Sequence, residues 1–223
     1  MDFIFMLTRR DQTVEDCLEV FEALGPLGLK HVGFKDVGVG YSTLDRLHQA
    51  IKQSGATSYM EVVSTTPDAA LNSARIALRL GVDRLMGGTD VAGTMDILAG
   101  TSTAYFPFPG RPLGHPTKLG GRPEEIEEQC RRFLDQGCAG VDLLAYRATE
   151  AEPLDLIAAA RRGLGSSGLL IVAGSIDSPK RIRAVAAAGT DAFTIGSAAF
   201  DGSFSPRKGL LANQLRDILA ACG

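Results

Sequence analysis

The chain has 223 residues, 45% of them hydrophobic, which is enough for one domain with a large core. The formal net charge of −3 is spread along the sequence without a basic block, and this excludes nucleic-acid binding through a bulk electrostatic footprint. No apolar stretch approaches the roughly 20 residues of a membrane span, and the short apolar run before Arg9 predicts a first strand, not a signal peptide.

Eight short apolar segments follow one another along the chain, and each is typical of a buried strand. They are 3–7, 31–34, 58–63, 84–87, 103–108, 142–146, 169–173 and 192–196. Between them lie amphipathic stretches at helical spacing that end near a glycine, as helix C-termini commonly do. Strands that alternate with helices predict a parallel sheet, and eight such units predict closure into one (β/α)8 barrel over residues 1–223.

The last two predicted strands both end at a Gly-Ser pair, Gly174-Ser175 and Gly196-Ser197. In a (β/α)8 barrel, the loops after strands 7 and 8 commonly bind phosphate through backbone N–H groups, which favours small residues at these positions. Each pair alone could be the ordinary glycine end of a buried strand. Together, one βα unit apart, they predict a phosphate site formed by Gly174, Ser175, Gly196 and Ser197.

The paired Gly-Ser strand ends, the chain length and the eightfold alternation resemble the ribulose-phosphate-binding barrel superfamily. Its members include phosphosugar epimerases, indole-glycerol-phosphate synthase, histidine-biosynthesis isomerases and phosphogluconate-type aldolases. The resemblance covers the whole chain in architecture but only its last quarter in motif. It implies a small phosphorylated metabolite as ligand and leaves a homodimer open. It does not select a reaction, because one fold hosts many chemistries.

Several motifs of these families are missing from the sequence. Strands 2 and 6 do not match the lysine strand of the aldolases, and strands 1 and 5 lack the paired aspartates of the histidine-biosynthesis isomerases. The Asp-x-Lys-x-x-Asp motif of the orotidine-phosphate decarboxylase group is absent. His31, His48 and His115 do not occupy successive strand ends, as epimerase metal ligands would. We therefore predict neither a metal ion nor a cofactor.

Strand alternation separates inward from outward side chains and selects two candidate catalytic residues. In the segment His31–Lys35 the apolar Val32 and Phe34 suit the helix-facing side, which directs Lys35 into the barrel. The same pattern in the next strand directs Glu61 inward. Because catalytic groups of barrel enzymes lie at the C-terminal ends of strands, Lys35 and Glu61 are expected as neighbours at the active-site rim.

A lysine beside a carboxylate in a closed site supports two kinds of chemistry. The pair can move protons next to a carbonyl, as in isomerisation or epimerisation, or a lysine of lowered pKa can form a Schiff base, as in an aldolase or synthase. The alternative without chemistry is a structural ion pair. A third class, a non-catalytic barrel that binds a phosphorylated metabolite, also fits the sequence. We prefer the isomerase or epimerase reading, with Lys35 and Glu61 as the acid/base pair.

Five further residues are weaker site candidates. Asp90 ends predicted strand 4 and is either a third catalytic residue or a helix N-cap. Asp11 is either a rim acid that binds substrate or a helix-start residue. Arg9 either contacts a second anionic group or is solvated, while Tyr146 and Arg147 close predicted strand 6, where both could bind substrate oxygens.

The remaining features concern the longest loop and the cysteines. The segment 109–123 is long for a loop in a compact domain and would overhang the mouth of the site after strand 5. The 4 cysteines show no C-x-x-C spacing, so they are expected to be reduced packing residues of a cytoplasmic protein.

Overall fold

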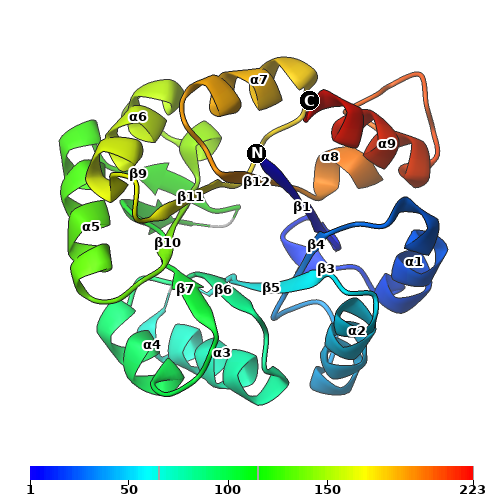
Figure 1. The fold of residues 1–223 in the computed structure, drawn as a ribbon, viewed down its shortest axis with the longest axis horizontal. Helices are drawn as coiled ribbons and strands as arrows, with labels where there is room; N and C mark the ends of the chain where they lie inside the picture. Colours follow the sequence, from blue (N-terminus) through cyan, green and yellow to red (C-terminus); the bar gives the residue numbers. More distant parts are fainter. Residues whose placement is uncertain (65, 115, 223) are drawn as a thin grey trace.

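A computed structural model describes residues 1–64, 66–114 and 116–222. Its main sheet has eight parallel strands in the order β10-β11-β12-β1-β4-β5-β6-β7 (Figure 1). The strands are β1 (Asp2–Met6), β4 (His31–Lys35), β5 (Thr57–Val62), β6 (Arg84–Gly87), β7 (Ala104–Phe106), β10 (Gly140–Leu143), β11 (Leu169–Val172) and β12 (Ala192–Ile195). Backbone hydrogen bonds from Ala139 N to Tyr105 O and from Asp142 N to Pro107 O join the two edges at 3.0 Å each. The predicted (β/α)8 barrel is confirmed.

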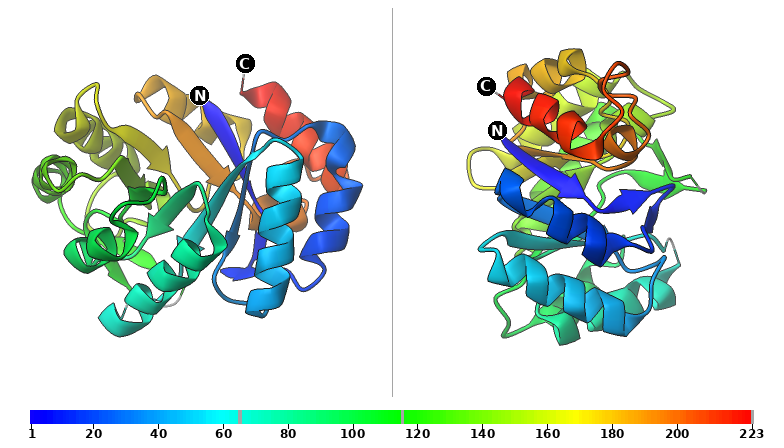
Figure 2. Two further views of the ribbon diagram at one scale, coloured as in Figure 1. Left: turned by 60° about the horizontal axis from the view of Figure 1, so that its bottom comes forward. Right: turned by 90° about the vertical axis from the view of Figure 1, so that its right-hand side faces the viewer.

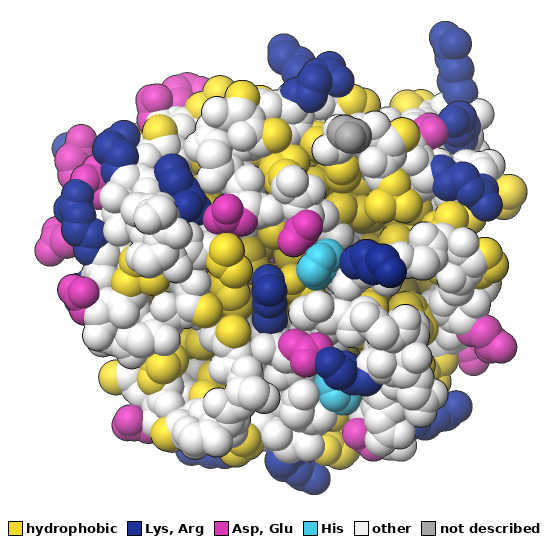
Figure 3. Space-filling view, in the orientation of Figure 1, with side chains coloured by type: hydrophobic (Ala, Val, Ile, Leu, Met, Phe, Trp, Pro, Cys, Tyr) yellow, Lys and Arg dark blue, Asp and Glu magenta, His cyan; other side chains and the backbone are white. Residues whose placement is uncertain are grey.

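Helices surround the barrel on all sides, as the views in Figures 1 and 2 show. The helices are α1 (Cys17–Ala23), α2 (Tyr41–Gln53), α3 (Pro67–Leu80), α4 (Val91–Leu98), α5 (Pro123–Asp135), α6 (Pro153–Leu164), α7 (Pro179–Ala187), α8 (Ser197–Phe200) and α9 (Leu211–Ala221), with short 3-10 turns η1 (Gly25–Leu27) and η2 (Ala145–Arg147). Acidic and basic side chains are interspersed on the face seen in Figure 3. None of the helices in the described part of the chain has the length and hydropathy needed to cross a membrane.

The predicted strand boundaries fail most clearly at the sixth strand. The sequence favoured 142–146, whereas β10 spans Gly140–Leu143 and the chain then turns into η2. The prediction was wrong because Leu144 and Ala145 are buried and apolar, and a short apolar run looks alike in a strand and in a buried turn. As a result, Tyr146 and Arg147 lie on a helical turn after the strand.

Side chains of the barrel strands alternate between two cores. Val32 and Phe34 of β4 pack in the larger core between sheet and helices, as do Met60 and Val62 of β5. A separate cluster fills the barrel itself. It contains Ile4, Met6, Tyr59, Met86, Phe106, Ile171 and Ala192. The alternation expected from the sequence is therefore confirmed. It places Lys35 and Glu61, the last inward residues of β4 and β5, at the C-terminal end of the barrel.

A polar network closes the opposite, N-terminal end of the barrel. Arg84 Nη1 donates to the Tyr59 hydroxyl at 2.9 Å, and this hydroxyl lies 3.0 Å from His31 Nδ1. The hydroxyl oxygen accepts from Arg84 and can donate its own proton to an unprotonated Nδ1. Burial lowers the pKa of His31 below its ordinary value of 6.5, against the attraction of Asp2.

The His31 network predicts a loss of stability in acid. The lowered pKa means that His31 binds a proton less readily in the folded protein than in the unfolded protein. The stabilising contribution is therefore complete above about pH 6.5 and is lost as the pH falls through the folded pKa. In urea titrations, His31→Gln should show a flatter dependence of unfolding free energy on pH between neutral and mildly acidic conditions. Parallel curves for parent and variant would contradict this assignment.

The long segment after β7 contains an antiparallel hairpin, β8 (Arg111–Leu113) and β9 (Lys118–Gly120). Arg111 ties it to the barrel through ion pairs with Glu125 at 2.7 Å and Glu150 at 2.8 Å. The predicted loop at 109–123 therefore has secondary structure of its own. His115 lies outside the described residues.

Candidate active site

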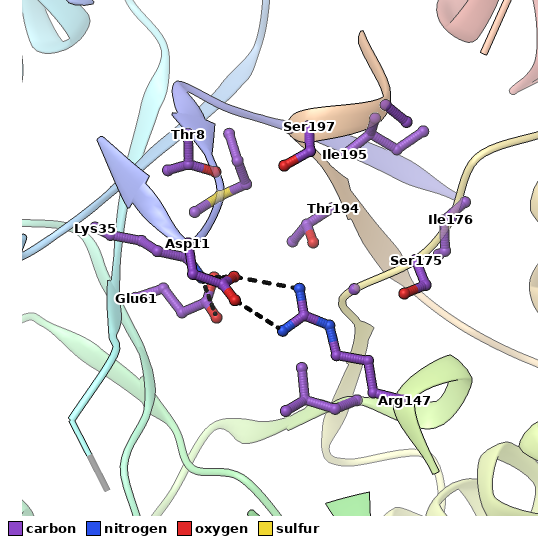
Figure 4. Close-up of a pocket in the computed structure, with 15 residues that line it drawn as sticks. Thr8, Asp11, Lys35, Glu61, Arg147, Ser175, Ile176, Thr194, Ile195 and Ser197 are labelled. Atoms are coloured by element: carbon purple, nitrogen blue, oxygen red, sulfur yellow. Dashed lines mark hydrogen bonds and ion pairs between the residues drawn. The ribbon is translucent and has the colours of Figure 1, made fainter. Parts of the chain in front are cut away.

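A cavity of about 170 Å³ opens at the C-terminal ends of the strands (Figure 4). Its wall combines charged side chains from β4, β5, the loop after β1 and η2 with small residues from the ends of β11 and β12. The lining residues are Met6, Thr8, Asp11, Lys35, Glu61, Leu144, Arg147, Gly174, Ser175, Ile176, Thr194, Ile195, Gly196, Ser197 and Ala198. The Lys35–Glu61 pair and the two Gly-Ser pairs were predicted separately from the sequence. In the structure they line a single cavity.

Lys35 lies at the centre of the charged half of the cavity. It pairs in register with Glu61 of the adjacent strand, and its Nζ lies 3.3 Å from Glu61 Oε1. The same Nζ donates to Asp11 Oδ1 at 2.8 Å. The backbone of Lys35 is fixed as well, because Thr13 Oγ1 accepts from Lys35 N and donates to Lys35 O, both at 2.8 Å.

The charges around Lys35 keep its amine protonated. Burial alone lowers the pKa of Lys35, but the carboxylates of Glu61 and Asp11 raise it by more, so the pKa lies above its ordinary value. The ammonium form therefore dominates at neutral pH. A lysine of lowered pKa, the state that a Schiff-base nucleophile requires, is not the resting state of this site.

Asp11 links Lys35 to Arg147. Arg147 Nη2 lies 3.2 Å from Asp11 Oδ1, and Nη1 lies 3.3 Å from Oδ2 (Figure 4). Burial raises the pKa of Asp11, yet Lys35 and Arg147 outweigh it and bring the pKa to about 2. Arg10 and Asp11 form the turn between β2 (Thr8–Arg9) and β3 (Gln12–Thr13). Both have left-handed φ values, 53° for Arg10 and 60° for Asp11. Such backbone strain in non-glycine residues persists only where the surroundings enforce it.

Asp11→Asn should cost about 2 kcal/mol of unfolding free energy at neutral pH, since its pKa falls from 3.8 to about 2 on folding. A lowered carboxyl pKa stabilises the protein above the unfolded value, and this contribution disappears as the pH falls from 3.8 towards 2. Urea titrations across that range should show the acid-dependent loss in the parent and not in the variant. Asp201→Asn is the matched control, because Asp201 pairs with Arg9 at the surface and should change little. Equal losses in both variants would contradict the assignment.

The two Gly-Ser pairs form the other half of the cavity. Gly174 and Ser175 both adopt left-handed φ values, 77° and 57°. A Cβ on Gly174 would lie 2.5 Å from Arg147 Nε, and one on Gly196 would lie 2.7 Å from the Thr8 carbonyl oxygen. Within the described part of the chain, the backbone N–H groups of Gly174, Ser175 and Ser197 donate to no other backbone group. Unused donors on a concave wall are what an anion requires.

Three of the predicted site residues lie outside this cavity. Asp90 is the N-cap of α4, where its carboxylate accepts from Gly93 N at 3.0 Å. Arg9 is half exposed and pairs with Asp201 at 2.5 Å. Tyr146 faces a separate groove, with the Arg181 guanidinium 4.8 Å from its ring centre. We therefore leave these three out of the proposed site.

Asp142, Thr8 and Thr194 were not predicted from the sequence. Thr8 and Thr194 line the cavity, and Asp142 lies inside the barrel with no exposed surface. Alternation would have directed Asp142 inward if the strand had been placed at Gly140–Leu143. Within the described ranges, no group of three or more His, Cys, Asp and Glu side chains is arranged to hold a metal ion.

No protein-family model and no curated protein matches the sequence. Solved structures do match over the whole chain. A native KDPGal structure has a TM-score of 0.69 at 14% identity, covering 99% of this chain and 96% of the other. Orotidine 5'-phosphate decarboxylase from Pyrococcus horikoshii OT3 has a TM-score of 0.66 at 13% identity, with coverages of 99% and 98%. The structure of 3-hexulose-6-phosphate synthase has a TM-score of 0.64 at 18% identity, with both chains fully covered. The chain thus shares the (β/α)8-barrel fold of these three structures.

Proposed function

We propose that this protein is an enzyme acting on a small phosphorylated sugar or a related phosphorylated metabolite. The phosphate would be bound by the backbone of Gly174, Ser175, Gly196 and Ser197, and the reacting carbons would lie against Lys35 and Glu61. The observation that carries the proposal is that both groups line one cavity, at the barrel end where enzymes of this fold keep their active sites. The names of two structural neighbours, a 5'-phosphate decarboxylase and a 6-phosphate synthase, agree with a phosphorylated ligand.

The charges of the site favour proton transfer next to a carbonyl, as in an isomerase or epimerase. Glu61 would remove a proton from the carbon beside the carbonyl, while the Lys35 ammonium donates a hydrogen bond to the carbonyl oxygen, where negative charge develops. Return of the proton by Glu61 to the neighbouring carbon, with the hydroxyl proton passing from one oxygen to the other, would complete an isomerisation. An epimerisation would instead require a second acid that delivers a proton to the opposite face of the same carbon. Both side chains are about nine-tenths buried, so water screens this charge stabilisation little.

The size of the cavity restricts the ligand. About 170 Å³ is below the range of roughly 300 to 1,000 Å³ that is typical of pockets for drug-sized molecules. A phosphorylated chain of a few carbons fits such a volume better than a nucleotide does. Arg147, held over Gly174 by Asp11, would contact the phosphate or a second anionic group.

A Schiff-base aldolase or synthase is the second candidate, because a buried lysine faces the cavity. Its first step would require the Lys35 ammonium to lose a proton. In the free protein, the negative charges of Glu61 and Asp11 stabilise that proton on Lys35. Reductive trapping separates the two functions. Borohydride with a carbonyl substrate should leave Lys35 unmodified if the reaction is proton transfer, whereas a stable adduct on Lys35 would establish the aldolase.

A panel of phosphorylated sugars of three to six carbons in deuterated water tests the proposed function itself. Proton transfer should exchange the hydrogen beside the carbonyl for deuterium, observed by NMR, and Glu61→Gln should abolish the exchange. The same sugars without phosphate are the control and should exchange at the background rate. Binding of phosphorylated sugars with no exchange and no adduct would contradict an enzyme and support the non-catalytic barrel.

A further inference from the structure

Asp142 is a carboxyl group inside the barrel that the proposed chemistry has not used. It belongs to β10, where Val141 and Leu143 on either side pack in the helix-facing core. The Asp142 side chain therefore points towards the barrel axis. It has no exposed surface, and neither carboxyl oxygen has a hydrogen-bond partner among the described residues.

An ionised carboxylate in this position would lose its hydration without receiving a single donor in return, which strongly favours uptake of a proton. The charged groups that act on it come from three elements: Glu61 of β5, Lys35 of β4 and Arg147 of η2. Burial raises the pKa of Asp142 most, and the negative charge of Glu61 raises it further. Lys35 and Arg147 oppose this but do not outweigh it, so the pKa lies well above its ordinary value.

We propose that Asp142 carries a proton at neutral pH and acts as a positioning residue for the proton chemistry of the cavity, because its charge state is coupled to that of Glu61. A neutral Asp142 adds no like charge beside Glu61, so the Lys35 ammonium remains paired with an ionised Glu61.

The role in turnover rests on the proposed function, but the protonation of Asp142 does not, and a titration without ligand tests it. NMR of protein labelled at the aspartate carboxyl carbons, with Asp142→Asn to assign the signal, should show a protonated Asp142 at neutral pH. Asp83, which pairs with Lys52 at 2.7 Å, should appear ionised in the same spectrum and serves as the matched control. An ionised Asp142 signal at neutral pH would overturn the proposal.

Coupling to Glu61 is tested by the same titration in Glu61→Gln. Removing the like charge should move the Asp142 midpoint to lower pH, and an unchanged midpoint would overturn the coupling between the two groups. Asp142→Asn should melt close to the parent temperature, because a neutral amide replaces a neutral acid of the same shape. If the panel identifies a substrate, this variant should keep the parent KM, with an altered pH profile of kcat, because the amide does not titrate. A parent-like pH profile would overturn the role in turnover, while leaving the proposed function intact.

Discussion

Replacing Lys35 by Met is expected to reduce deuterium exchange or turnover of the phosphorylated substrate by about 10²- to 10³-fold or more, the usual cost of removing one group that stabilises developing charge. Phosphate binding should persist, because the Gly-Ser loops lie on the opposite wall of the cavity. The variant should also lose about 3 to 5 kcal/mol of unfolding free energy, since Glu61 and Asp11 are left as buried charges without their shared partner.

Two comparisons separate chemistry from stability in that experiment. Lys52→Met removes a lysine that pairs with Asp83 far from the cavity, and it should leave turnover unchanged. The double variant Lys35→Met with Glu61→Gln should be more stable than the sum of the single losses predicts, because the two residues are coupled. Full turnover in Lys35→Met, measured under conditions where the variant is folded, would contradict the assignment of Lys35 to the reaction.

Replacing Gly174 by Ala is expected to weaken binding of inorganic phosphate or of a phosphorylated sugar by at least about tenfold, which corresponds to roughly 1.4 kcal/mol. Gly174 has a φ of 77°, and the added Cβ would lie 2.5 Å from Arg147 Nε. The substitution would therefore strain the loop and displace Arg147 at the same time. Isothermal titration calorimetry would measure the affinity.

Gly81 supplies the matched control for this change. It has a φ of 74°, ends α3 away from the cavity, and a Cβ there would meet no atom within 4 Å. Gly81→Ala should cost stability of the same order through backbone strain and leave phosphate affinity unchanged. If both variants bind phosphate as tightly as the parent does, the loop at Gly174 is not the phosphate site.

The sequence was sufficient for the parts of this site that depend on local patterns. Alternation of apolar residues in His31–Lys35 and in the next strand placed Lys35 and Glu61 together, because strand periodicity and register determine which inward residues become neighbours. The two Gly-Ser pairs could be placed at strand ends because each follows a short apolar run, and both pairs line the cavity. These are short-range signals.

What the sequence could not supply depends on where turns begin and on contacts between distant segments. The turn at η2 was hidden by buried apolar residues, so Asp142 was not predicted to face inward. The contact between Asp11 and Arg147 joins residues 136 positions apart, and no local sequence pattern predicts it. Asp90 fitted a catalytic role and a helix cap equally well in sequence, and only the hydrogen bond from Gly93 shows which contact it makes.

In the proposed function, one cavity holds a phosphate group at its Gly-Ser wall and the reaction takes place at its Lys35 wall. The most direct test is a crystal structure of the protein with inorganic phosphate or a phosphorylated sugar. We expect the phosphorus atom against Gly174-Ser175 and Gly196-Ser197, roughly 6 to 10 Å from Lys35 Nζ, the span of a short carbon chain. An anion bound elsewhere, such as in the groove beside Tyr146 and Arg181, with none at the Gly-Ser loops, would contradict the account.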